Sequence, residues 1–118
     1  MLNLGHKKLE VWKLSIDLIK FIYKTTESFP KSELFGITSQ LRRASVSIAS
    51  NIAEGCARKS LSERKRFFEI SRSSLVEVDT QLEICIELNY ISEYTEISIN
   101  QSLNLLFAKL SKFINNAK

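Results

Sequence analysis

The sequence predicts an all-α protein, a single domain over residues 1–118 folded as an antiparallel, up-down-up-down four-helix bundle. The 118 residues include only three Gly and one Pro, which argues against sandwiches, barrels and Gly-rich nucleotide-binding loops. In four successive segments apolar residues recur at intervals of three and four, the pattern of an amphipathic helix. The connections between these segments are short, so successive helices should pack antiparallel.

The first two predicted helices span residues 8–27 and 34–57. The first should end before Pro30, because the residue preceding a proline resists the α conformation. Gly36 is expected in a short turn early in the second segment. Gly55 is expected near its end, where a left-handed cap favours glycine, although residues 56–58 could add another turn. The apolar positions of the two helices are Leu9, Trp12, Ile16, Ile19 and Tyr23, then Leu34, Ile37, Leu41, Ala44, Ile48 and Ile52.

The third predicted helix spans residues 61–89. Ser60 and Glu63 have the spacing of a capping box, in which the serine accepts from the third amide and the glutamate reaches back to the serine. Asn89 is expected to end this helix. Its apolar face is formed by Phe68, Leu75, Val78, Leu82, Cys85 and Leu88.

The fourth predicted helix spans residues 93–116. Ser92 is its expected N-cap, and Glu93 and Glu96 are favourably placed near the positive end of the helix dipole. Its apolar face is formed by Ile99, Leu103, Leu106, Leu110 and Phe113.

This chain lacks the catalytic or metal-binding residues that most enzyme classes require. His6 is the only histidine, so neither a Glu-x-x-His di-iron site nor a Ser-His or Cys-His catalytic pair has an organised partner. Cys56 and Cys85 are too far apart for a zinc knuckle or a dithiol redox motif and are interpreted as buried thiols. There is no Walker or dinucleotide glycine pattern. We therefore expect no enzymatic activity, no cofactor and no resident metal.

The chain has no feature of a membrane or secreted protein. Its start does not resemble a signal peptide, and no apolar run approaches the roughly 18 residues that span a bilayer. We expect a cytoplasmic protein.

Two polar stripes run along the second and third helices and are not explained by the core. Three interpretations are open: a solvated face, a subunit interface or inter-helix network, or a magnesium site formed by Glu54, Glu69 and Glu77. In the second interpretation, Arg43 or Arg58 would pair with Glu69 or Glu77. The stripes consist of Gln40, Arg43, Ser47, Asn51, Glu54 and Arg58, and of Arg66, Glu69, Ser73, Glu77 and Thr80.

The positive charge is concentrated in the middle of the chain. All six arginines lie within residues 42–72, where eight basic and three acidic residues give +5, whereas nine basic and ten acidic residues elsewhere give −1. The antiparallel fold should bring residues 58–66 to one end of the bundle. The planar guanidinium fork suits phosphate, so the candidate nucleic-acid-binding residues are Arg42, Arg43, Arg58, Lys59, Arg64, Lys65 and Arg66.

Other partners for these basic residues remain open. They could pair with Glu63, Glu69 and acidic residues of a neighbouring subunit, or contact a membrane surface. Phe67 and Phe68 are the only nearby aromatic residues, and at least one should be core. Binding to nucleic acid would therefore be directed at the backbone and weakly sequence-specific.

Several segments, in this order, resemble the bacterial 23S rRNA intervening-sequence proteins, the S23 family, over nearly the whole chain. Ser73 departs from the pattern, because the family more often has glycine there. The matching residues are Leu9-Glu10-Val11-Trp12-Lys13, Phe29-Pro30, Glu33, Phe35-Gly36, Gln40-Leu41-Arg42-Arg43-Ala44-Ser45-Val46-Ser47-Ile48, Asn51-Ile52-Ala53-Glu54-Gly55, Arg58, Ser60, Phe67, Ser73-Ser74-Leu75, Glu77 and Leu88-Asn89-Tyr90-Ile91.

The resemblance implies an antiparallel bundle that assembles into a pentameric ring. Most family members have no known activity. A related branch, the accessory proteins of diversity-generating retroelements, forms a basic pentamer that binds nucleic acid and a reverse transcriptase. By this resemblance we expect a homo-oligomer that binds structured RNA or DNA, or alternatively a protein-interaction scaffold such as a reverse-transcriptase adaptor. The candidate oligomer or network residues are Gln40, Ser47, Asn51, Glu54, Glu69, Ser73 and Glu77.

Overall fold

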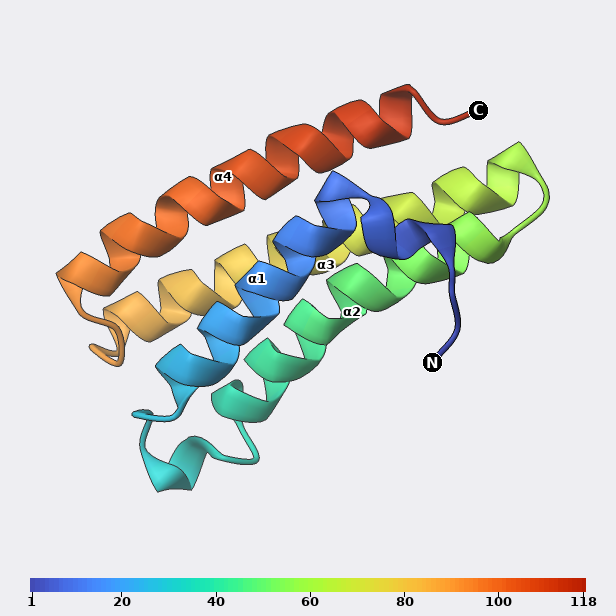
Figure 1. The fold of residues 1–118 in the computed structure, drawn as a ribbon. Helices are drawn as coiled ribbons and strands as arrows, with labels where there is room; N and C mark the ends of the chain where they lie inside the picture. Colours follow the sequence, from blue (N-terminus) through green and yellow to red (C-terminus); the bar gives the residue numbers. More distant parts are fainter.

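The computed structural model describes residues 1–118 and contains four α-helices and no strands. Each helix runs antiparallel to the next (Figure 1), as the sequence predicts. The N-terminal segment and the α1–α2 connection each add a short 3-10 helix. The elements are η1 (Gly5–Lys8), α1 (Glu10–Thr26), η2 (Lys31–Glu33), α2 (Ile37–Ala57), α3 (Leu61–Glu87) and α4 (Glu93–Asn115).

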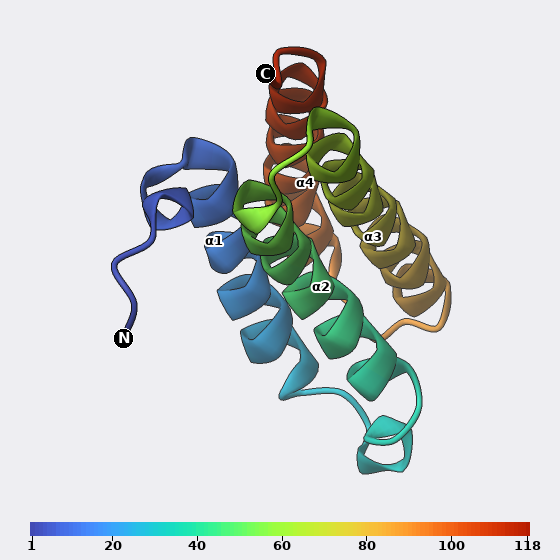
Figure 2. The ribbon, with the colours of Figure 1, turned by 90° about the vertical axis from the view of Figure 1, so that its right-hand side faces the viewer.

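Each helix packs against two others, so that the four surround one core. α2 lies between α1 and α3, and α4 closes the bundle against α3 and α1 (Figure 2). All four helices contribute fully buried side chains to one cluster, among them Ile22, Leu41, Phe68 and Leu106. None of the helices has an apolar stretch long enough to cross a membrane.

The helix ends follow the local signals in the sequence. Ser60 Oγ accepts the amide of Glu63 at 3.2 Å, and Ser92 Oγ accepts the amide of Thr95 at 3.2 Å. Asn89 ends α3 in the left-handed conformation, with φ of 61°. One half of the predicted capping box is wrong, because the Glu63 carboxylate pairs with Arg66 at 3.0 Å instead of reaching back.

α2 and α3 form the most closely packed pair, and Gly55 lies at their contact. A Cβ atom on Gly55 would lie 2.4 Å from Cε1 of Phe68 and 3.1 Å from the carbonyl oxygen of Arg64. The expectation of a left-handed cap here is wrong, since no glycine has a positive φ and α2 continues to Ala57. Gly55 is required because the α3 side chains approach its backbone closely.

Replacing Gly55 with alanine is expected to destabilise the protein. Helix propensity alone favours alanine by about 1 kcal/mol, but overpacking costs about 1–3 kcal/mol. Phe68 has no room to retreat, because its ring centroid lies 4.8 Å from that of Phe113. Urea unfolding should therefore show a net loss, whereas Ser50→Ala on the exposed side of α2 should be neutral or slightly stabilising. A Gly55→Ala variant as stable as wild type would contradict this packing.

Candidate nucleic-acid interface

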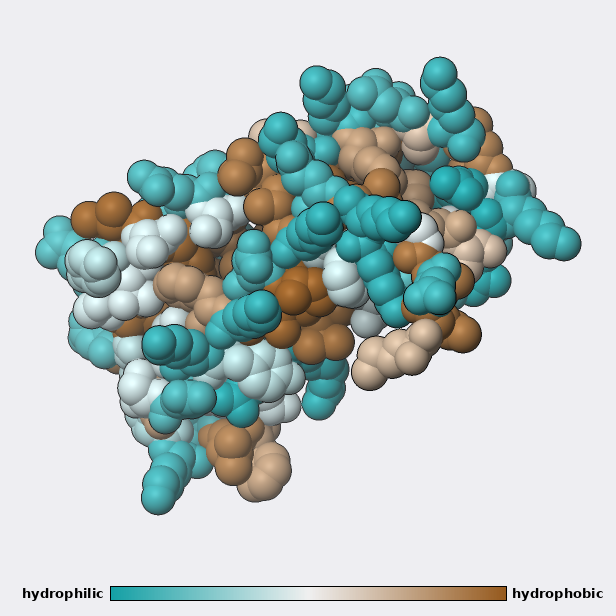
Figure 3. Space-filling model, viewed as in Figure 1, coloured by the Kyte–Doolittle hydropathy of each residue, from teal (hydrophilic) through white to brown (hydrophobic).

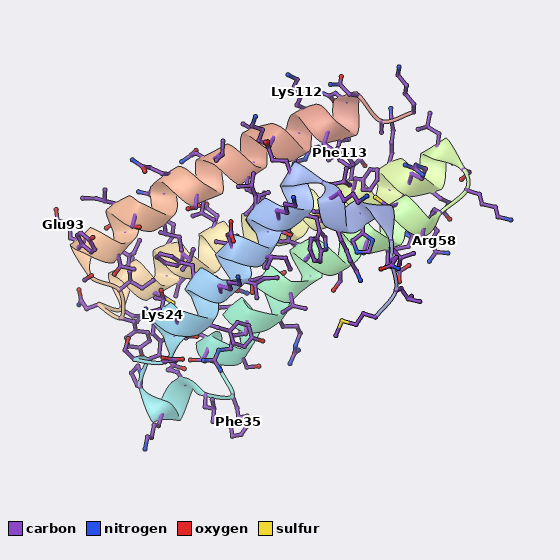
Figure 4. All side chains as sticks on the ribbon, in the orientation of Figure 1. Lys24, Phe35, Arg58, Glu93, Lys112 and Phe113 are labelled. Atoms are coloured by element: carbon purple, nitrogen blue, oxygen red, sulfur yellow. The ribbon has the colours of Figure 1, made fainter.

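The α2–α3 turn gathers five basic residues at one end of the bundle. α2 ends at Ala57 and α3 begins at Leu61, so the short turn sets the end of one helix beside the start of the next (Figure 1). Arg58 lies at this end of the molecule (Figure 4). We call this set the basic tip, and it consists of Arg58, Lys59, Arg64, Lys65 and Arg66.

Two guanidinium groups of the basic tip contact one aromatic ring. The Cζ atoms of Arg58 and Arg66 lie 4.7 Å and 5.0 Å from the ring centroid of the half-buried Phe67. Each also pairs with a carboxylate of its own helix, Arg58 with Glu54 at 3.1 Å and Arg66 with Glu63 at 3.0 Å. Both arginine side chains stay about half exposed, at 46% and 61%. The ring and the carboxylates thus orient two exposed guanidinium groups.

The two aromatic residues beside the basic tip, Phe67 and Phe68, leave little surface for base stacking. Phe68 is completely buried, and two guanidinium groups lie against Phe67. This arrangement suits contacts to a phosphate backbone better than stacking on exposed bases.

Arg64 differs from the other residues of the basic tip because part of its guanidinium group is buried without a hydrogen-bond partner. Its Nε is buried and has no hydrogen-bond partner. Its Nη1 donates one long hydrogen bond, 3.5 Å, to the carbonyl oxygen of Cys56. Burial raises the pKa of the Cys56 thiol, and the nearby Arg64 charge opposes that rise. The remaining positive charge of the basic tip comes from Arg58, Lys59 and Arg66, which are exposed, and from Lys65, which is partly buried.

Arg42 and Arg43 lie far from the basic tip. Fifteen residues separate Arg43 from Arg58 on α2, which corresponds to roughly 22 Å along the helix. Arg42 ties α2 to the end of α1: its Nε donates to Thr26 Oγ1 at 2.9 Å, and its Cζ lies 4.7 Å from the Tyr23 ring centroid. Arg43 is exposed. The seven basic residues that the sequence analysis grouped into one nucleic-acid-binding site therefore do not form a single site, because Arg42 and Arg43 lie apart from the basic tip.

The polar stripe of α2 lies along the seam with α3. Ser47 Oγ is 2.9 Å from Ser74 Oγ, and Asn51 Nδ2 donates to the carbonyl oxygen of Ser47 at 2.8 Å. Ser74 belongs to the buried face of α3. It is the residue after Ser73, which the sequence analysis placed in the polar stripe of this helix. The remaining stripe residues are exposed: Gln40, Arg43, Glu54 and Arg58 on α2, and Arg66, Glu69, Ser73, Glu77 and Thr80 on α3.

The carboxylates of the stripes do not form a common site. Arg58 pairs with Glu54, and neither Arg43 nor Arg58 forms an ion pair with Glu69 or Glu77. No three metal-ligating side chains come together anywhere in the chain. The stripes therefore contribute an inter-helix hydrogen bond and an exposed polar surface.

Residues 7–112 match the sequence profile of a family described as 23S rRNA-intervening sequence protein. The chain belongs to this family. It is also similar to a solved structure, a protein of unknown function from the S23 ribosomal protein family of Bacteroides thetaiotaomicron VPI-5482. The two are 24% identical with a TM-score of 0.78, over 88% of this chain and 97% of that one, and this likeness shows the shared fold. No curated protein matches the chain.

In this member of the intervening-sequence family, several residues of the matching segments in α2 lie at the α2–α3 contact. Ser47 and Asn51 form the polar seam, and Ile48 and Ile52 are completely buried. Gly55 lets Phe68 approach. Packing within one subunit therefore accounts for these five residues of the matching α2 segments.

Sequence reasoning missed an acidic region that balances the basic tip. Residues 73–108 contain six carboxylates and no lysine or arginine, a net −6, while residues 1–41 and 109–118 contain nine basic and four acidic residues, a net +5. The charges of these segments sum to −1, so the total for the outer part of the chain conceals both the acidic region and the excess of lysine. Glu93 lies at the opposite end of the molecule from Arg58 (Figure 4). The acidic residues are Glu77, Asp79, Glu83, Glu87, Glu93 and Glu96.

Proposed function

We propose that the protein is a cytoplasmic, non-enzymatic homo-oligomer that binds the phosphate backbone of structured RNA or DNA through its basic tip. The observation that carries this proposal is the pair of guanidinium groups on Phe67. Lys59 and Lys65 lie next to these arginines in the chain. Orienting the two arginines before binding reduces the entropy lost when they contact phosphate.

The ion pairs within the basic tip do not prevent phosphate binding. Exposed pairs such as Arg58–Glu54 are worth at most about 1 kcal/mol, whereas contacts of arginine with phosphate release condensed counterions. The acidic region at the other end of the bundle also favours binding through the basic tip. It repels the phosphate backbone, so the protein approaches nucleic acid with the basic tip first.

Assembly into a ring would strengthen weak binding by one subunit. The family resemblance supports a pentamer, in which several basic tips engage one nucleic acid and gain avidity. Exposed apolar side chains support an oligomer independently. Val76, Ile97 and Phe107 are 50%, 61% and 44% exposed, and other apolar side chains (brown) lie at the surface over α1 and α4 (Figure 3).

Removing the four charges of the basic tip other than that of Arg64 should abolish most of the binding. The test variant combines Arg58→Ala, Lys59→Ala, Lys65→Ala and Arg66→Ala. A dye-labelled RNA hairpin, followed by fluorescence anisotropy at about 50 mM salt, should bind the variant about 100-fold more weakly or worse, as expected for the loss of four phosphate contacts.

The matched control removes the same charge from other exposed positions. It replaces Lys13, Lys20, Lys24 and Lys31 with alanine. The control should retain most of the affinity, because only the long-range field is weakened. Equal losses in the two variants, or no binding by the wild-type protein, would contradict the proposal.

One observation favours a second function, that of a protein-interaction scaffold. Arg58 and Arg66 already pair with carboxylates, and acidic side chains of a partner protein such as a reverse transcriptase could replace them. Purification with one stoichiometric protein and no nucleic acid would support this alternative.

A further inference from the structure

Below the basic tip lies a cavity of about 330 Å³. The 3-10 helix η1, the last turns of α2 and α4, and the first turn of α3 line it, and it is open to solvent on one side. Phe113, which lies near the C-terminal end of α4 (Figure 4), forms one wall together with Leu4 and Leu9. Its polar groups come from His6, Cys56 and Arg64.

Arg64 has no adequate partner within the protein. It forms no ion pair, unlike Arg58 and Arg66. Its hydrogen bonding consists of the one long contact to Cys56, and its Nε has none. Burying part of a guanidinium group without a counter-charge or a hydrogen-bond acceptor is costly, so arginine in such a place is usually paired. The cavity supplies the space in which an anion could pair with it.

We propose that this cavity binds a small organic carboxylate with an apolar body. The carboxylate accepts hydrogen bonds from the Arg64 guanidinium, and the apolar body lies against Leu9 and Phe113. A monoanion matches the single arginine, because a phosphate dianion would leave a charge uncompensated between apolar walls. This site is separate from the proposed nucleic-acid surface, which uses the other four residues of the basic tip.

Cys56 provides a reporter for occupation of the cavity. It lines the cavity and is half-buried, whereas Cys85, the other cysteine, is completely buried. The probe is octanoate, and the readout is the rate at which N-ethylmaleimide alkylates Cys56. At ten times its dissociation constant, octanoate leaves about a tenth of the sites free and should slow alkylation about tenfold. Octanol, which has the same chain without the charge, and inorganic phosphate should have little effect.

Arg64→Gln should weaken protection by octanoate about tenfold or more, the effect of losing a charge-assisted hydrogen bond. Arg58→Gln removes an exposed charge of the basic tip and should leave protection unchanged. A third variant, Ala53→Leu, extends a side chain from the α2 wall into the cavity and should abolish protection with Arg64 still in place. It keeps the test decisive if Arg64→Gln fails to fold.

Three results would overturn the proposal. They are equal protection by octanol or phosphate, undiminished protection in both cavity variants, and no protection at millimolar octanoate. None of them bears on nucleic-acid binding, which is measured with variants of the other four residues of the basic tip.

Discussion

Phe68→Ala is expected to lower the free energy of unfolding by about 3–5 kcal/mol, the range for removing a buried phenylalanine. Phe68 is completely buried, contacts Phe113 edge-on and fills the space left by Gly55. Its loss leaves a cavity where α2, α3 and α4 meet. The long helices around this cavity cannot move inward far enough to fill it. Since domains of this size are stable by only about 5–15 kcal/mol, the variant should be close to unfolding at physiological temperature. Urea unfolding followed by circular dichroism measures the change.

Phe107→Ala is the matched control for this prediction. Phe107 is also an aromatic residue of the bundle but is 44% exposed, so its removal should cost less than about 1 kcal/mol in the monomer. Equal losses in the two variants would show that Phe68 is not the central packing residue of this end of the bundle.

Binding of RNA is expected to weaken about 100-fold per basic tip when monovalent salt rises from about 50 mM to about 200 mM. The reason is that the four side chains of Arg58, Lys59, Lys65 and Arg66, each neutralising one phosphate, give a slope of about −3.6 in the plot of log K against log salt. Lys59→Ala should reduce the slope by about one unit. An affinity that does not change with salt would show that the basic tip does not contact phosphate.

The helices and their ends could be predicted because their determinants are local. Alternating spacings of three and four identify the buried faces of α2, α3 and α4, whereas the face predicted for α1 is wrong. α1 buries Val11, Ser15, Leu18 and Ile22, each one position before a predicted residue, and Tyr23 of the predicted face is 41% exposed. Ser60, Asn89 and Ser92 act on amides or conformations within one turn. The short connections then leave little freedom in how successive helices pack. The family motifs led to the same fold independently.

The roles of individual residues in the site depend on contacts that spacing does not contain. Gly55 has the position of a cap but is needed because Phe68, thirteen residues later, returns to its backbone. Arg42 and Arg64 carry the same charge as their neighbours, yet one contacts α1 and the other is partly buried beside η1. The N-terminal segment that lines the cavity beside Arg64 has no helical periodicity from which its position could be inferred. The acidic region, by contrast, is a property of the sequence itself, because residues 73–108 contain six carboxylates and no lysine or arginine.

Sedimentation velocity of the protein mixed with a dye-labelled RNA hairpin tests the central claim most directly, because it reports assembly and RNA binding together. We predict that the dye moves with a protein boundary several times heavier than the 13.5 kDa chain. The variant in which Arg58, Lys59, Lys65 and Arg66 are replaced by alanine should keep that protein boundary and leave the dye behind. Dye that stays with free RNA in the presence of the wild-type protein, or that moves equally with the variant, would contradict the account.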